Sequence, residues 1–140
     1  MNIKHKILLT AAVLLLSGCI TLPDPTPAKK EPPPPEMVKD SLSQICKEAK
    51  SNYIRASDLY RNKGMSIKGK VYRFNEFVIY IDVNNNVGAS IQLKDPQAVK
   101  RISMGQTIYV TGVISSVSYT SAPYLDSGGA CGISLKNATF

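Results

Sequence analysis

The spacing of apolar residues changes several times along this chain of 140 residues. Residues 7–16 form an almost unbroken apolar run, whereas residues 20–36 hold seven of the nine prolines and few large apolar side chains. Beyond this segment, apolar positions recur first with the period of a helix and then in the alternation typical of strands. We therefore expect one folded domain, residues 37–140, behind an apolar run and a Pro-rich linker.

The domain opens with the pattern of an amphipathic helix within residues 36–54. Lysines lie on its polar face, and its apolar face is formed by Val38, Leu42, Ile45, Cys46 and Ala49. The polar pair Ser51 and Asn52 predicts a break in this helix. A second short helical turn follows within residues 54–64 and is expected to end at Gly64.

Five runs with a period of two then predict strands over residues 65–74, 77–83, 87–93, 106–117 and 131–140. The positions expected to face the core are Met65, Ile67, Gly69, Val71, Phe77, Ile79, Ile81, Val83, Val87, Ala89, Ile91, Leu93, Ile108, Val110, Gly112, Ile133 and Leu135. Between the third and fourth strands, Asp95 as N-cap and Pro96 at the first helical position predict a helix.

The order strand, strand, strand, helix, strand, strand is that of the OB-fold, a five-stranded Greek-key barrel. Gly69 and Gly112 lie inside strands, where the absence of a side chain permits a tight bend. The sequence thus predicts a mainly β domain with an N-terminal helix and a helix between strands three and four. A simple sandwich or an open meander is the alternative, and the second helix favours the barrel.

The segment SNYIRASDLYRNKGMSIKGKVYRF resembles the opening of the OB-fold family named for its similarity to tRNA-anticodon-binding domains. The matching positions are Asn52, Ala56, Tyr60, Ile67, Gly69 and Val71. MGQTIYVTGVI and CGISLKNA are similar to the fourth and fifth strands of that family, so the resemblance covers about residues 44–139. It implies the fold and no activity, because its motifs are structural and many members are secreted proteins or lipoproteins without a known task.

The beginning of the chain has the pattern of a secretory signal, in which basic residues precede an apolar run. The run is shorter than the about 20 residues of a membrane-spanning helix. It ends in Leu16-Ser17-Gly18-Cys19, which resembles the lipobox of bacterial lipoproteins. The resemblance implies a signal peptide over residues 1–18, cleavage before Cys19, and acylation of Cys19 with diacylglycerol and a fatty acid such as palmitate.

The same resemblance predicts the location of the protein. Residue 20 is Ile rather than Asp, which in enteric-type lipoproteins implies sorting to the outer membrane with the domain facing the periplasm. Residues 19–36 would be a lipidated Cys and a Pro-rich spacer that reaches on the order of 50 Å. The alternatives are a plain secretory signal or uncleaved anchor with an incidental Cys, and a PxxP docking segment in the linker.

Composition restricts the chemistry of the mature chain. The single His, His5, lies in the signal, so neither a His-centred catalyst nor a His-based metal site is expected, and no cofactor is predicted. Loss of the two signal lysines lowers the net charge from +7 to +5, too little for a dedicated nucleic-acid binder. Cys46 and Cys131 remain besides Cys19, and in an oxidising compartment they predict a disulfide, with two reduced buried thiols as the alternative.

A candidate ligand face lies on the outer side of the strands, where OB-folds bind oligonucleotides or oligosaccharides. Alternation and strand order place on it Tyr72, Tyr80, Tyr109, Lys68 and Lys70. Aromatic rings beside cations suit stacked bases and phosphates. Ordinary strand surface is the other interpretation, because Tyr has a high strand propensity and the third strand offers only Gly88, Ser90 and Gln92 outward.

Functions from different classes remain open. The first is a non-catalytic envelope lipoprotein whose OB domain binds a protein or another envelope component, including a role in conjugation, secretion or exclusion of incoming DNA. The second is an OB module for single-stranded nucleic acid or an anionic glycan, and the location disfavours nucleic acid. The third is a hydrolase using Asp82 and Asp126, although the sequence has no nucleophile motif. We expect the first: no enzyme, membrane attachment through Cys19, and a protein partner.

Overall fold

The computed structural model describes residues 32–84, 86–121 and 130–140. The expected signal peptide, Cys19 and most of the linker lie outside these residues. The chain from Pro33 to Phe140 forms a compact unit. Its elements are, in chain order, the α-helix α1 (Leu42–Tyr60), the strands β1 (Gly64–Phe74), β2 (Val78–Asn84) and β3 (Val87–Leu93), the 3₁₀ helix η1 (Pro96–Arg101), and the strands β4 (Thr107–Thr120) and β5 (Ala130–Thr139).

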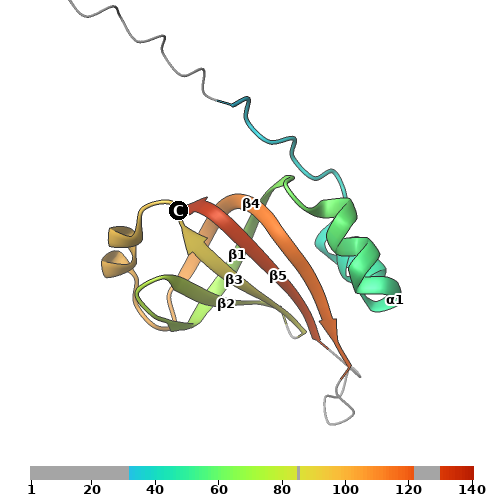
Figure 1. The fold of residues 1–140 in the computed structure, drawn as a ribbon. Coiled ribbons are helices and arrows are strands. Elements are labelled where there is room, and N and C mark those ends of the chain that lie inside the picture. Colours follow the sequence, from blue (N-terminus) through green and yellow to red (C-terminus); the bar gives the residue numbers. More distant parts are fainter. Residues whose placement is uncertain (1–31, 85, 122–129) are drawn as a thin grey trace, which may run out of the picture. The chain divides into compact units, whose positions relative to one another are not determined.

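The strands close into a barrel in the order β1-β2-β3-β5-β4. Helix α1 packs against β4 on the outside of the barrel (Figure 1). Neighbouring strands are antiparallel except β3 and β5, which run parallel. The prediction of a mainly β barrel with an N-terminal helix is confirmed. In the part of the chain that the structure describes, no helix is both long enough and apolar enough to cross a membrane.

The barrel interior holds most of the side chains that alternation places inward. Those of β1 and β3 are buried in the expected order, except that Val87 is only half-buried. In β2, Ile79 and Ile81 are buried and Val83 is half-buried beside the hairpin. The buried face of α1, which includes Ile45 and Ala49, extends the same core, so helix and barrel share one apolar interior.

Two predicted details of the strands and their connections are wrong. Phe77 is exposed and precedes β2, because the side chain of Asn75 accepts hydrogen bonds from the backbone N–H groups of Phe77 at 2.9 Å and Val78 at 2.8 Å and forms a turn. The helix between β3 and β4 is the short 3₁₀ helix η1. Asp95 caps it as expected and accepts from the N–H of Gln97 at 2.9 Å.

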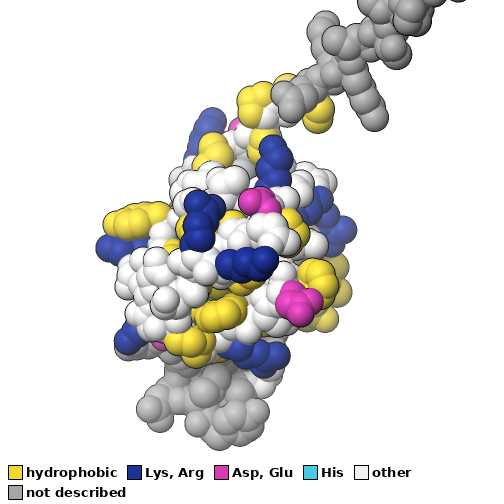
Figure 2. Space-filling model, turned by 90° about the vertical axis from the view of Figure 1, so that its left-hand side faces the viewer, with side chains coloured by type: hydrophobic (Ala, Val, Ile, Leu, Met, Phe, Trp, Pro, Cys, Tyr) yellow, Lys and Arg dark blue, Asp and Glu magenta, His cyan; other side chains and the backbone are white. Residues whose placement is uncertain are grey.

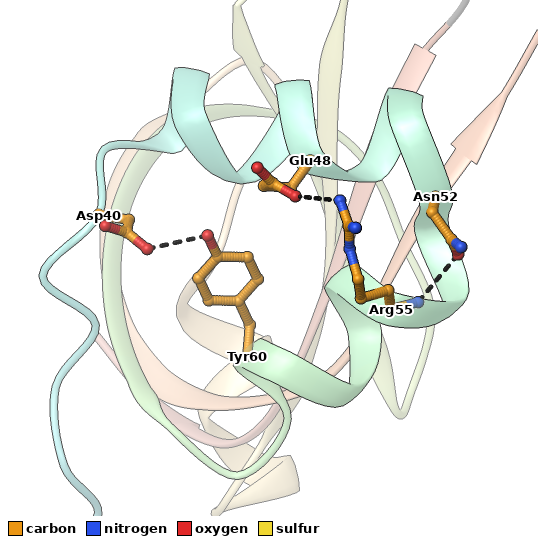
Figure 3. Close-up of polar contacts among 5 residues, drawn as sticks. All are labelled: Asp40, Glu48, Asn52, Arg55 and Tyr60. Carbon is orange, nitrogen blue, oxygen red and sulfur yellow. Dashed lines mark hydrogen bonds and ion pairs between the residues drawn. The ribbon is translucent and has the colours of Figure 1, made fainter.

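Helix α1 contains the predicted break. Asn52 has φ −160° and ψ 97°, values outside the helical region, and its side-chain oxygen accepts from the N–H of Arg55 at 3.0 Å (Figure 3). Asn52 therefore caps the second half of the helix in the way that Ser41 caps the first. The ion pair between Arg55 and Glu48, at 2.8 Å, spans the break.

The end of α1 differs from the expectation. The left-handed residue that follows the helix is Asn62, with φ 67°, whereas Gly64 is the first residue of β1. Gly64 pairs there with the entering chain: its N–H donates to Glu36 O at 2.7 Å, and the N–H of Val38 donates to Gly64 O at 2.8 Å. The segment 36–38 is thus tied to the start of the barrel.

A disulfide joins α1 to β5. Cys46 and Cys131 are bonded, with their Cα atoms 5.6 Å apart, in the pairing that the sequence predicts. Cys131 is buried and Cys46 packs at the margin of the core. The bond therefore connects the first half of the helix to the last strand, across a sequence separation of 85 residues.

Candidate ligand-binding face

Two tyrosines of the predicted face come together on the outside of the barrel. Tyr72 on β1 and Tyr80 on β2 have ring centroids 6.3 Å apart and planes inclined by 49°. The register of β1 against β2 shifts between Val71 and Arg73, so that Arg73 rather than Tyr72 lies opposite Tyr80. The guanidinium of Arg73 consequently lies 4.9 Å from the centroid of the Tyr80 ring, a cation–π distance.

A groove of about 290 Å³ runs from this tyrosine pair across β3 and β5. Its floor consists of small residues, because the parallel register places Gly88 opposite Gly132 and Ser90 opposite Ser134. The hydroxyl of Ser90 donates to Ser134 Oγ at 2.9 Å. At Gly88 the floor is open, because a Cβ there would have no neighbour closer than 3.8 Å, whereas Ser118 Oγ lies 2.6 Å from the Cβ position of Gly132 and covers that part of the floor.

The far wall of the groove adds another hydroxyl. Ser118 on β4 donates to the carbonyl of Gly132 at 3.3 Å, and Thr120 lies at the same edge. None of the described residues that line this groove is Asp or Glu. Aromatic rings on one side and hydroxyls on the other suit noncovalent binding of an extended ligand, and they supply no acid–base pair.

The other residues of the predicted face do not line the groove. Lys68 and Tyr109 form a separate pair where β1 meets β4, with the ammonium 4.8 Å from the ring centroid, and they are directly opposite in the strand register. Lys70 lies opposite Asp82 on β2. The structure therefore divides the predicted face into a groove walled by Tyr72 and Tyr80 and a second cation–aromatic pair.

The predicted acidic pair is only half described. Asp82 is exposed and borders a hollow next to the groove, together with Tyr72 and Gly88. Asp126 lies outside the described residues. Within the described ranges, no group of three His, Cys, Asp or Glu side chains is placed to hold a metal ion.

Gly132 and Ser134 are not among the site residues that the sequence predicts, and the small side chains of the third strand count there against a ligand face. The sequence does contain a pattern that could have indicated them: in both VGASIQL and CGISLKN, a Gly-x-Ser triplet begins at the second residue. The parallel pairing of β3 with β5 brings these triplets side by side. That pairing joins residues more than forty positions apart, and alternation along one strand does not reveal it.

Comparison with known proteins found no matching family model, no matching curated protein and no matching solved structure.

Proposed function

We propose that this protein is a non-catalytic lipoprotein of the bacterial outer membrane whose barrel is an OB-fold and binds a protein or another envelope component. The OB-fold assignment is supported by the strand order β1-β2-β3-β5-β4 with a helical connection between β3 and β4. Membership in the tRNA-anticodon-binding-like family rests on the sequence motif, in which Asn52 caps the second half of the helix and Tyr60 fills the core beneath it.

Anchoring rests on the lipobox-like residues 16–19. Several acyl chains on Cys19 would give stable attachment, because each buried methylene contributes about 0.8 kcal/mol. The substitution Cys19→Ser should therefore release the protein from membranes and abolish its labelling by radioactive fatty acid. Unchanged membrane fractionation of this variant would reject lipid anchoring at Cys19.

The observation that carries the binding function is the glycine and serine groove beside Tyr72 and Tyr80. Every strand of the closed barrel has two neighbours, but residues 65–69 of β1 pair only with β4, and residues 115–120 of β4 pair only with β5. The binding mode we propose is not strand addition but contact with side chains, because the groove offers aromatic surface and hydroxyl groups. A segment of a partner protein lying across β3 and β5 fits this arrangement.

Site-specific photocrosslinking in intact cells tests this binding mode. A photoreactive residue at position 80 should give a discrete crosslinked product with an envelope protein, and one at Tyr53 on α1 should not. Gly88→Leu is the matched groove variant, because a Cβ at this position has no neighbour closer than 3.8 Å, so a side chain enters the groove without a clash. A product that persists in Gly88→Leu, or the same product from position 53, would exclude the groove as the binding site.

The alternative ligand is single-stranded nucleic acid or an anionic glycan. The cation–π pairs Arg73–Tyr80 and Lys68–Tyr109 favour it, since such pairs place positive charge beside stacking surfaces. If it were correct, a fluorescent oligonucleotide would bind with an affinity that falls steeply with salt, and Tyr80→Ala would cost about 1–3 kcal/mol. We expect negligible binding at physiological salt and no effect of Tyr80→Ala.

A further inference from the structure

Exposed apolar side chains gather at one end of the barrel, where β1 and β3 finish and β2 and β4 begin. Phe77 between β1 and β2 has 67% of its surface accessible, and Met104 between η1 and β4 has 61%. Phe140, directly after β5, and Phe74, at the end of β1, are also exposed. Large apolar residues that gather in this way on a small domain indicate an interaction surface.

The two most exposed of these residues lie on tight turns. The Phe77 turn is held by the side chain of Asn75, which accepts from two successive backbone N–H groups. In the Met104 turn, Gln106 N donates to Ser103 O at 3.2 Å, and the Gln106 side chain accepts from Ser103 N at 3.0 Å. The N–H of Gly105 donates to the carbonyl of Val71 at 2.7 Å and ties this turn to β1. Ordered turns therefore present both apolar side chains.

Positive charge surrounds these apolar residues. Figure 2, which views the molecule from the side of η1, shows hydrophobic side chains interspersed with many Lys and Arg and few acidic groups. The charged residues at this end are Lys70, Arg73, Lys94, Lys100, Arg101, Glu76 and Asp95. Asp95 already caps η1. Among the described residues, none of these five cations has a carboxylate within ion-pair distance.

We propose that this end of the barrel binds the surface of a bilayer that contains anionic lipid. Separate apolar side chains on turns can enter the boundary between headgroups and acyl chains, while the lysines and arginines between them meet lipid phosphates. Phe, Met and Arg are also enriched in protein–protein interfaces, but lysine is depleted there and charged residues are depleted at the core of such interfaces. Here Arg101 lies 5.6 Å from the ring of Phe140, so cation and aromatic ring are interleaved.

None of the four apolar residues of this surface lines the groove, although Arg73 lies beside Tyr80 at the edge of the groove, and the test does not depend on acylation of Cys19. The chain has no Trp, so Phe77→Trp introduces a single fluorescent reporter at an exposed turn. The full-length protein is mixed with vesicles of phosphatidylcholine alone or with phosphatidylglycerol, in each case with and without brominated acyl chains. Tyr53→Trp on α1, on the other side of the barrel, is the matched reporter (Figure 1).

With phosphatidylglycerol, the emission of the Phe77→Trp variant should shift to shorter wavelength and be quenched by brominated lipid, whereas that of the Tyr53→Trp variant should respond little. Raising the ionic strength from about 0.01 M to about 1 M shortens the screening length from about 30 Å to about 3 Å and should reverse the response. Replacing Lys100 and Arg101 by Gln on the Phe77→Trp background should weaken vesicle binding about fivefold for each cation removed.

Four results would overturn the proposal. The first is no change in the emission of the Phe77→Trp variant with any vesicle. The second is equal quenching of the reporters at positions 77 and 53, which would mean that the chain is merely held near the membrane. The third is equal quenching in neutral and anionic vesicles, and the fourth is no effect of the double Gln variant. In either case the cations would have no part in binding. Circular dichroism of each variant confirms that the barrel is folded.

Discussion

Tyr60 is the residue at which α1, the entering chain and the core meet. It is 2% exposed, and its hydroxyl donates to the carboxylate of Asp40 at 2.9 Å (Figure 3). Burial, followed by the hydrogen bond to Asp40, raises the pKa of Tyr60 from 10.0 to about 12. The neutral phenol is thus favoured in the folded state, where Tyr60 packs in the core.

This pKa gives the first prediction. The contribution of neutral Tyr60 to stability is complete below pH 10, the unfolded value, and is lost as the pH rises through the folded value of about 12. Tyr60→Phe should lower the free energy of unfolding by about 1 kcal/mol at neutral pH. Between pH 10 and about pH 12, the stability of this variant should fall less than that of the wild type. Urea unfolding at a series of pH values measures both, and parallel pH profiles would contradict the assignment.

Glycines in the strands give the second prediction. A Cβ at Gly69 would lie 2.8 Å from the carbonyl oxygen of Asp82 and 2.9 Å from Ile81 Cδ1, so the neighbouring strand would have to move. Gly69→Ala should therefore destabilise the protein by about 1–3 kcal/mol. Gly88→Ala is the control, because its Cβ would meet only Ile81 O at 3.8 Å. Equal loss of stability in both variants, measured by urea unfolding, would mean that crowding at Gly69 is not the cause.

At the scale of the elements, local patterns explain most of what the sequence predicts correctly. The break at Asn52 follows from a polar residue whose side chain competes with the helical hydrogen bonds, and the inward residues of β1 follow from alternation alone. Alternation misplaces Phe77 because its parity continues that of β2, while the turn that exposes it depends on where the side chain of Asn75 bonds. Alternation predicts which side chains of a strand face the core, but it does not predict at which residue the strand begins.

The cap inside α1 gives the third prediction. Asn52→Ala removes the acceptor for Arg55 N and should cost about 0.5–2 kcal/mol of stability, the usual range for an N-cap. Asn52→Asp keeps an acceptor oxygen and should recover most of the loss. Thermal unfolding of the three proteins under identical conditions compares them. An Asp variant as unstable as the Ala variant would show that the hydrogen bond is not what stabilises the break.

At the scale of the whole molecule, the sequence predicts the order of elements but not the groove. The floor requires the parallel pairing of β3 with β5 and its exact register, both of which are set by closure of the barrel. The cluster of apolar and basic residues around η1 likewise comes from turns that lie far apart in sequence. Binding surfaces made from several elements are therefore the part that local patterns leave undetermined.

The disulfide is the one covalent link at this scale among the described residues, and it gives the fourth prediction. In the chain-entropy model, a bond that closes a loop across a separation of 85 residues stabilises the folded state by about 4–5 kcal/mol. Replacing Cys46 and Cys131 together by Ser should lower the free energy of unfolding by roughly that amount. A reductant should destabilise the wild type to a similar extent and leave the double variant unchanged. The unfolded, unreduced wild type should show no free thiol from this pair. A double variant as stable as the wild type would mean that helix and barrel packing alone hold the fold, and that the bond adds nothing to it.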